Sequence, residues 1–180
     1  MRFALITLVV LPVIALPAAA ATVDPKQLVL APTDVPAGFR LDRAETGIRT
    51  NELEAKEYPE TRAPFRRWRR VIGYQASYRG KDASRIEARA DLFRDAAGAR
   101  QLQDWADREY RRSGISGLRR SHAGVGAGGV VFWGGGHAGH AFVLWRYGRV
   151  WAGIAGIGLG KERTLALARA QQRRIAAVLG

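Results

Sequence analysis

Residues 85–92, Arg-Ile-Glu-Ala-Arg-Ala-Asp-Leu, decide the fold that we expect, because apolar and charged side chains alternate along the whole stretch. A period of two is typical of a β-strand with one buried face. Residues 68–79 show the same period, with Arg70 as the exception on the apolar face, and Gly80-Lys81-Asp82 predicts a turn between the two runs. The sequence therefore predicts an antiparallel pair of strands. The apolar face of the strand expected at residues 68–79 consists of Trp68, Ile72, Tyr74, Ala76 and Tyr78.

A helix is expected directly after this pair of strands. Asp95 can cap its first turn, and Gly114 follows its predicted end near Arg112. Apolar residues recur between them at steps of three and four, which is typical of a helix with one buried stripe. The predicted stripe consists of Ala99, Leu102, Trp105, Ala106 and Tyr110.

The second half of the chain repeats this order. Residues 129–133 predict a short strand, residues 140–147 and 149–157 predict a hairpin, and residues 161–179 predict a final helix. We therefore expect an α+β fold: an antiparallel sheet built from two successive strand-strand-helix units, with the helices packed on one face. The side chains expected to be buried together are Trp105, Ile86, Leu92, Leu102, Ile154 and Ile175.

Residues 1–21 have the features of a secretory signal peptide. Arg2 is followed by a long apolar run, and Pro17 precedes four alanines. We expect cleavage after Ala20 or Ala21, which leaves residues 22–180 as a single α+β domain that is secreted and extracytoplasmic. The alternative is an uncleaved membrane anchor, whose apolar stretch would be near the lower limit for spanning a bilayer.

The composition is strongly basic and contains no cysteine. Lys and Arg number 29 against 16 Asp and Glu, so the formal net charge is +13, and no carboxylate occurs between Glu109 and Glu162. Arginine predominates over lysine. Such a surplus concentrates polyanions and anionic membrane surfaces near a protein. An anionic cell-envelope polymer or a membrane surface is therefore a candidate partner, and we expect no specific nucleic acid.

The densest cationic run is Arg66-Arg67-Trp68-Arg69-Arg70. Arginines in such a run can hold phosphates, sulfates or lipid headgroups, and the tryptophan can stack or anchor at an interface. These residues form our candidate anion-binding site. The competing interpretation, which we favour, is a strand start whose arginines are solvated or paired with Glu57 and Glu60 and whose tryptophan lies in the core.

The three histidines of the chain are the candidate metal ligands. His137 and His140 are close enough in sequence to bind one ion together, and His122 could supply a third ligand. No acidic residue lies near them in the sequence to orient the rings. We therefore favour solvated loop histidines and expect no cofactor.

Catalytic signatures are weak in this sequence. No Gly-x-Ser-x-Gly motif is present. Glu87 and Asp91 share a strand face, but four residues along a strand span about 13 Å, which is wide for a pair of catalytic carboxylates. Arg89 between them favours ordinary surface pairing. We therefore lean against enzymatic activity.

Three segments resemble a broad group of uncharacterised secreted actinobacterial α+β proteins. They are Asp34-Val35-Pro36-Ala37-Gly38-Phe39, residues 92–99 at a strand-to-helix junction, and Trp145-Arg146-Tyr147-Gly148-Arg149-Val150. At greater distance the chain is similar to the extracellular sensor domain of mycobacterial serine/threonine kinases, an α+β sheet with a cleft. The resemblance implies a fold of this kind and a binding role.

Three functions remain open from the sequence. The first is a secreted, non-enzymatic binding or sensor-like domain, which a cleft lined by tryptophans would favour. The second is a cationic protein that docks on anionic envelope polymers or a membrane surface, which one merged arginine patch would favour. The third is a hydrolase with an unrecognised site, which Ser, His and Asp clustered in a pocket would favour.

Overall fold

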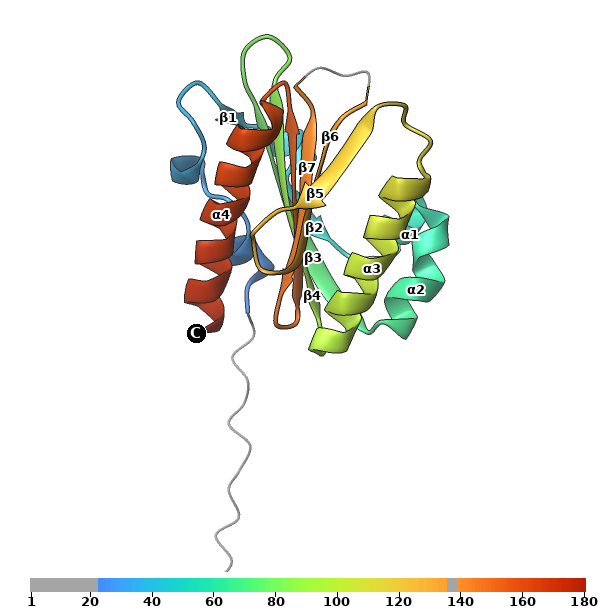
Figure 1. Cartoon of the computed structure of the whole chain (residues 1–180). Coiled ribbons are helices and arrows are strands. Elements are labelled where there is room, and N and C mark those ends of the chain that lie inside the picture. Colours follow the sequence, from blue (N-terminus) through green and yellow to red (C-terminus); the bar gives the residue numbers. More distant parts are fainter. Residues whose placement is uncertain (1–22, 136–138) are drawn as a thin grey trace, which may run out of the picture.

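The computed structural model describes residues 23–135 and 139–180 (Figure 1). One antiparallel sheet of eight strands has the order β1-β3-β4-β8-β7-β6-β5, and β2 also pairs with β3. The expected signal peptide and His137 lie outside the described residues. The strands are β1 (Arg40–Leu41), β2 (Gly47–Arg49), β3 (Arg70–Arg79), β4 (Arg85–Phe93), β5 (Leu118–His122), β6 (Ala127–Gly134), β7 (Ala141–Tyr147) and β8 (Val150–Ile157).

Four α-helices accompany the sheet in the described part of the chain. They are α1 (Asn51–Glu57), α2 (Arg62–Arg67), α3 (Ala96–Arg112) and α4 (Gly160–Leu179). Short 3-10 helices are η1 (Pro25–Leu28), η2 (Pro32–Asp34), η3 (Arg43–Glu45) and η4 (Pro59–Thr61). The expected α+β class and antiparallel sheet are confirmed. None of the described helices is both long and apolar enough to cross a membrane.

The first strand-strand-helix unit forms as its sequence predicts, except that β3 begins at Arg70, so Trp68 precedes the strand and packs against the α3-side cluster instead of the apolar face of β3. Ile86 of β4 lies opposite Tyr78 of β3, so the two apolar faces coincide. Asp95 caps α3, since its Oδ1 accepts a hydrogen bond of 2.9 Å from the backbone N–H of Gly98. Alternation and capping are local signals, and both act here as expected.

The helices lie on both faces of the sheet, so the expected packing on one face is wrong. Figure 1 shows the sheet between α4 on one side and α3, with α1 and α2, on the other. In β7, Val143 and Trp145 belong to the apolar cluster that includes α4, whereas Leu144 belongs to the cluster that includes α3. Neighbouring residues of a strand point to opposite faces. Continuous apolar runs such as residues 142–145 are typical of strands covered on both sides.

The expected single core is accordingly divided into two. One cluster lies under α4 and the other under α3. Trp105 is only partly buried at the edge of the second cluster, so its predicted burial with the others is wrong. The α4-side cluster contains Ile86, Leu92, Ile154 and Ile175, and the α3-side cluster contains Leu102.

The second unit contains one more strand than the sequence predicted. Strand β5, Leu-Arg-Arg-Ser-His, pairs with β6 and forms an edge of the sheet. Its burial pattern is intermediate or exposed throughout, so no apolar alternation marks it. Charged residues are usual on edge strands because they discourage pairing with other chains.

Candidate ligand-binding groove

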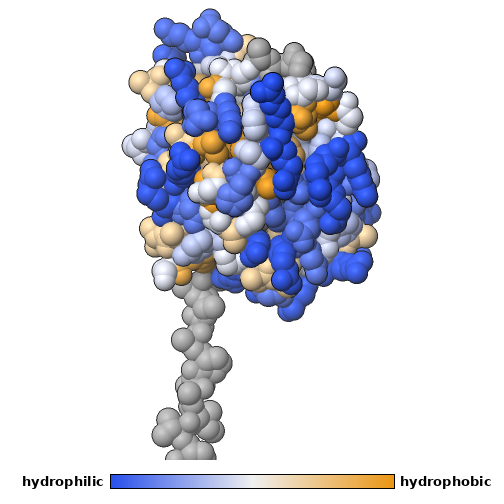
Figure 2. All heavy atoms as spheres, viewed as in Figure 1, coloured by the Kyte–Doolittle hydropathy of each residue, from blue (hydrophilic) through white to orange (hydrophobic). Residues whose placement is uncertain are grey.

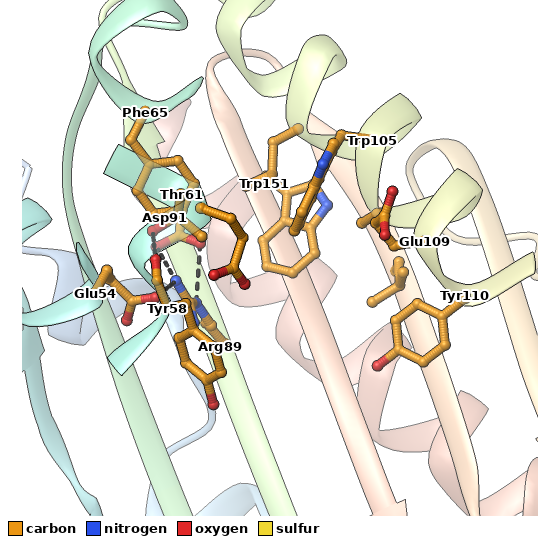
Figure 3. Close-up of a pocket in the computed structure, with 14 residues that line it drawn as sticks. Glu54, Tyr58, Thr61, Phe65, Arg89, Asp91, Trp105, Glu109, Tyr110 and Trp151 are labelled. Atoms are coloured by element: carbon orange, nitrogen blue, oxygen red, sulfur yellow. Dashed lines mark hydrogen bonds and ion pairs between the residues drawn. The ribbon is translucent and has the colours of Figure 1, made fainter. Parts of the chain in front are cut away.

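A groove lies over the sheet between α3 and the segment α1–η4–α2. One cavity of about 310 Å³ and a neighbouring one of about 270 Å³ form its two halves. The two halves adjoin because they share five lining residues, namely Tyr58, Arg89, Tyr110, Leu144 and Trp151. Figure 3 shows the larger half, with the ion-paired Glu54, Arg89 and Asp91 on one side and the indole rings on the other.

Local sequence places the segment that forms the charged wall. Thr50 caps α1 by accepting a hydrogen bond of 3.1 Å from the N–H of Leu53. The helix then buries Glu54, whose Oε1 accepts a bond of 2.6 Å from Arg49 Nε. Arg49 also pairs with Glu57 through its other nitrogens. The carboxylate of Glu54 is thereby held toward the sheet.

A buried ion-pair network forms this side of the groove. Arg70 donates to Asp91 Oδ1 from Nε at 3.0 Å and from Nη2 at 2.5 Å, and both side chains are 0% exposed. Arg89 joins Asp91 Oδ2 at 3.0 Å to Glu54 Oε2 at 2.9 Å (Figure 3). Arg70 Nη1 also donates to Asn51 Oδ1 at 2.7 Å. The network ties α1 to β3 and β4.

The sequence predicted ordinary surface pairing around Arg89, and the structure corrects this. Arg89 does pair with Asp91, but beneath α1 and within the fold, whereas Glu87 pairs with Arg85 at 2.9 Å. The polar face of β4 is covered because the polar segment α1–η4–α2 folds over it. Long-range packing made that face internal, and alternation alone carries no information on what covers the polar side.

The charges of this network reinforce one another. Burial raises the pKa of Asp91, but the neighbouring Arg89 and Arg70 outweigh it and hold that pKa below its ordinary value. Burial acts against the charged form of Arg89, yet Asp91 and Glu54 raise its pKa above the ordinary value. The groups therefore stay ionised and neutralise one another. Carboxylates so occupied are poorly placed to act as a catalytic acid and base.

Gly73 of β3 leaves the space that the network needs. A Cβ atom at this position would collide with Asp91 Oδ1 and with Arg70 Nη2. A larger residue would have to displace a buried ion pair, which is costly.

Aromatic side chains form the opposite side of the groove. Trp105 and Tyr110 come from α3, and Trp151 from β8. Tyr110 stacks on Phe132 with 4.9 Å between ring centroids, and burial raises its pKa to about 12. The Nε1 atom of Trp151 is buried without a hydrogen-bond partner in the described structure. Tyr58 is half-exposed at the opening, across from Tyr110 (Figure 3).

The cationic run 66–70 is divided among different environments. Arg66 and Arg67 are exposed, as the favoured interpretation expected, but they end α2, and the strand begins only at Arg70. Trp68 packs near Phe65 and Trp105, with ring centroids at 6.3 and 6.1 Å. Arg69 pairs with Asp95 at 3.1 Å, and Arg70 is internal. Anion binding by this run stays a prediction, and only its first two arginines are free of ion pairs in the described structure.

The structure separates two of the three histidines. His122 of β5 pairs with Val130 of β6, and Val130 pairs with Leu144 of β7. His122 is therefore level with Leu144, which lies four positions after His140 in the chain. That offset amounts to about 13 Å along the strands. His122 Nδ1 accepts a hydrogen bond of 3.1 Å from the N–H of Gly124. Within residues 23–135 and 139–180, no group of three His, Cys, Asp or Glu is arranged to hold a metal ion.

The groove has no local signature in the sequence because its residues come from distant segments. Glu54 and Arg89 are 35 positions apart, and Tyr58 faces Tyr110 from across the groove. One signal was present: Arg70 interrupts an otherwise apolar alternation. A charged residue in such a position needs a buried partner, and Asp91 on the neighbouring strand is that partner.

The comparisons with known proteins bear on the fold alone. No family model matches the chain, and no curated protein matches it. Among solved structures it is similar to the extracellular domain of PknH from Mycobacterium tuberculosis, with a TM-score of 0.54 and 10% sequence identity. The match covers 86% of this chain and 94% of that one. The resemblance to mycobacterial kinase extracellular domains is thus confirmed at the level of the fold.

Proposed function

We propose that this protein is an extracytoplasmic, non-enzymatic binding domain of the sensor-like type, and that its ligand occupies the groove between α3 and α1–η4–α2. The observation that carries the proposal is the groove itself. Its larger half, of about 310 Å³, is lined by two tryptophans beside a neutralised ion-pair network. Pockets for small organic molecules begin at about 300 Å³ and combine apolar walls with a few placed polar groups.

The walls of the groove are held in place by contacts within the protein. The Arg70–Asp91 pair is fully buried, and Tyr110 is stacked on Phe132. A site of this kind loses little side-chain freedom on binding, which favours affinity. The likeness to an extracellular kinase domain supports both the location and the sensor-like role. The described lining contains no Ser or His, so it offers no serine–histidine pair for hydrolysis.

A neutral fluorescent dye, N-phenyl-1-naphthylamine, provides the test. We expect saturable binding with one dye per protein, and a loss of at least about tenfold in affinity for Trp105→Ala/Tyr110→Ala, because these rings line the groove. The matched control is Leu41→Ala, in a separate cavity on the other side of the sheet beside η1 and β3. Dye binding that is absent, or that survives the groove substitutions unchanged, would overturn the proposal.

A second candidate function is docking on an anionic envelope polymer or membrane surface. The observation that favours it is the pair Arg66 and Arg67, which are exposed and form no ion pair in the described structure. Figure 2 shows a face on which hydrophilic side chains predominate and hydrophobic ones appear in small areas. Exposed arginines that form no ion pair suit weak electrostatic contact with an anionic surface. The two functions are compatible, since docking would hold a ligand-binding domain near the envelope.

A further inference from the structure

We propose that the groove selects an organic cation: a quaternary or protonated ammonium group carried on an apolar body. The inference rests on the proposed function, because it names the chemical class of ligand for the same groove. It follows from a local reversal of charge, from two carboxylates left without a close partner, and from the aromatic rings around them.

The charge of the groove is opposite to that of the protein. The whole chain has 29 basic against 16 acidic residues. Of the described residues that line the two halves of the groove, Arg89 is the only Lys or Arg. The acidic residues among them are Glu54, Glu60, Glu87, Asp91 and Glu109. Ion pairs with Arg49, Arg70 and Arg85 offset part of this count, and the negative surplus that remains favours a positive ligand.

Three of these carboxylates are already neutralised within the fold. Glu54 and Asp91 share Arg89, and each has a further arginine behind it. Glu87 is paired with Arg85 at 2.9 Å. Since Arg89 lies between two carboxylates, its own charge is compensated and repels a cation little.

Glu60 and Glu109 are the two lining carboxylates whose charge no close partner offsets in the described structure. Glu60 forms no ion pair in the described part of the chain, and Glu109 has only a contact of 3.9 Å with the exposed Arg112. Both line the larger half of the groove. Figure 3 shows Glu109 close to Trp105, on the aromatic side. A cation there would meet carboxylates that lack close partners.

The aromatic rings add a second source of attraction for a cation. Tyr58, Trp105, Tyr110 and Trp151 line the same half of the groove. Faces of such rings attract ammonium groups, and quaternary ammonium ligands are bound in this way by aromatic cages. An organic cation also loses less hydration than a metal ion when it leaves water, so partly apolar walls suit it. An anion would instead face two carboxylates without close partners and an arginine already held by Asp91 and Glu54.

Three probes with one benzyl body separate charge from shape. They are benzyltrimethylammonium, its neutral analogue neopentylbenzene, and the anion benzylsulfonate. The affinity of each probe is measured by its displacement of N-phenyl-1-naphthylamine. It is measured a second time by direct titration, with the tryptophan fluorescence of the protein as the signal. We expect the cation to bind about tenfold more tightly than the neutral analogue, and the anion more weakly than both.

Matched variants test which residues carry this preference. In Glu60→Gln/Glu109→Gln, we expect the cation to lose most of its tenfold advantage while the neutral dye binds as before. The control Glu52→Gln/Glu162→Gln removes the same two charges from exposed positions outside the groove, and should leave the preference unchanged. Both double variants are surface substitutions that we expect to leave folding intact.

The outcomes distinguish the two proposals. Equal binding of cation and neutral analogue, preference for the anion, or a preference that survives Glu60→Gln/Glu109→Gln would overturn the cation proposal and leave groove binding standing. Absence of any binding, by dye displacement and by direct titration, would overturn both proposals.

Discussion

The guanidinium group of Arg70 and the carboxylate of Asp91 lie together inside the protein, with Arg70 Nε 3.0 Å from Asp91 Oδ1 and neither side chain exposed. A bulge explains how Arg70 comes to lie there. Between Arg70 and Ile72 the register of β3 against β4 shifts, so Arg70 is opposite Phe93 while Ile72 is opposite Leu92. The shift turns Arg70 to the face of Asp91, away from the apolar face that simple alternation assigns to it.

Neutralising Arg70 should therefore destabilise the protein far more than neutralising its neighbour. We expect Arg70→Gln to lower the free energy of unfolding by about 3–5 kcal/mol, because Asp91 would be left buried and with one fewer partner. Arg69→Gln is the matched control: Arg69 is 58% exposed, and its pair with Asp95 should contribute less than about 1 kcal/mol. Urea denaturation of both variants measures the difference, and equal losses would contradict the assignment.

Acid should weaken the contribution of Asp91. Its folded-state pKa lies below the ordinary value of 3.8, so the stabilisation is fully present above that value and is lost as pH falls through the lower folded pKa. We expect the stability advantage of the wild type over Asp91→Asn to narrow as pH falls below about 4. Urea midpoints of both proteins across an acid series measure it. A constant difference would show that the carboxylate is not stabilised in the folded state.

Two tryptophans on opposite faces should differ in their effect on stability. Trp145 is 0% exposed under α4, so Trp145→Ala should cost about 3–5 kcal/mol. Trp105 is only partly buried where it lines the groove, so Trp105→Ala should cost roughly half as much or less. Chemical denaturation with an unchanged m-value provides the comparison. A larger loss for Trp105 would mean that its ring belongs to the core.

Export should remove the N-terminal segment. The small residues before Thr22 predict cleavage after Ala20 or Ala21. N-terminal sequencing of the exported protein should then begin at Ala21 or Thr22. A product that still begins at Met1 would favour the membrane anchor.

Attachment to polyanions should depend on salt and on α2. Arg66 and Arg67 are exposed, so Arg66→Gln/Arg67→Gln should weaken retention on anionic vesicles by roughly fivefold at low salt. Exposed charges are screened over about 8 Å at physiological ionic strength, so retention should also fall as salt rises.

The control for this prediction removes the same charge elsewhere. Arg169 and Arg173 are exposed on α4, and Arg169→Gln/Arg173→Gln should have the smaller effect. Salt-independent retention, or equal losses in the two variants, would mean that the arginines of α2 are an ordinary solvated surface.

The sequence alone determined the elements that depend on local signals. Alternation along residues 85–92 predicted β4, Asp95 and its following stripe predicted α3, and the hairpin about Gly148 predicted β7 and β8. Strand period, helix capping and turn chemistry act over a few residues, so they can be recognised without knowing the rest of the fold.

The positions of the charged residues depend on long-range packing. Arg70 and Asp91 are 21 positions apart, and Glu54 and Arg89 are 35 positions apart, so no local pattern joins them. The bulge beside Arg70 and the cover provided by α1 turned a polar strand face into the wall of a groove. The physical reason is that the free energy of a charge depends on its surroundings: the same arginine is solvated at an open surface and paired inside a fold, and long-range packing selects between them.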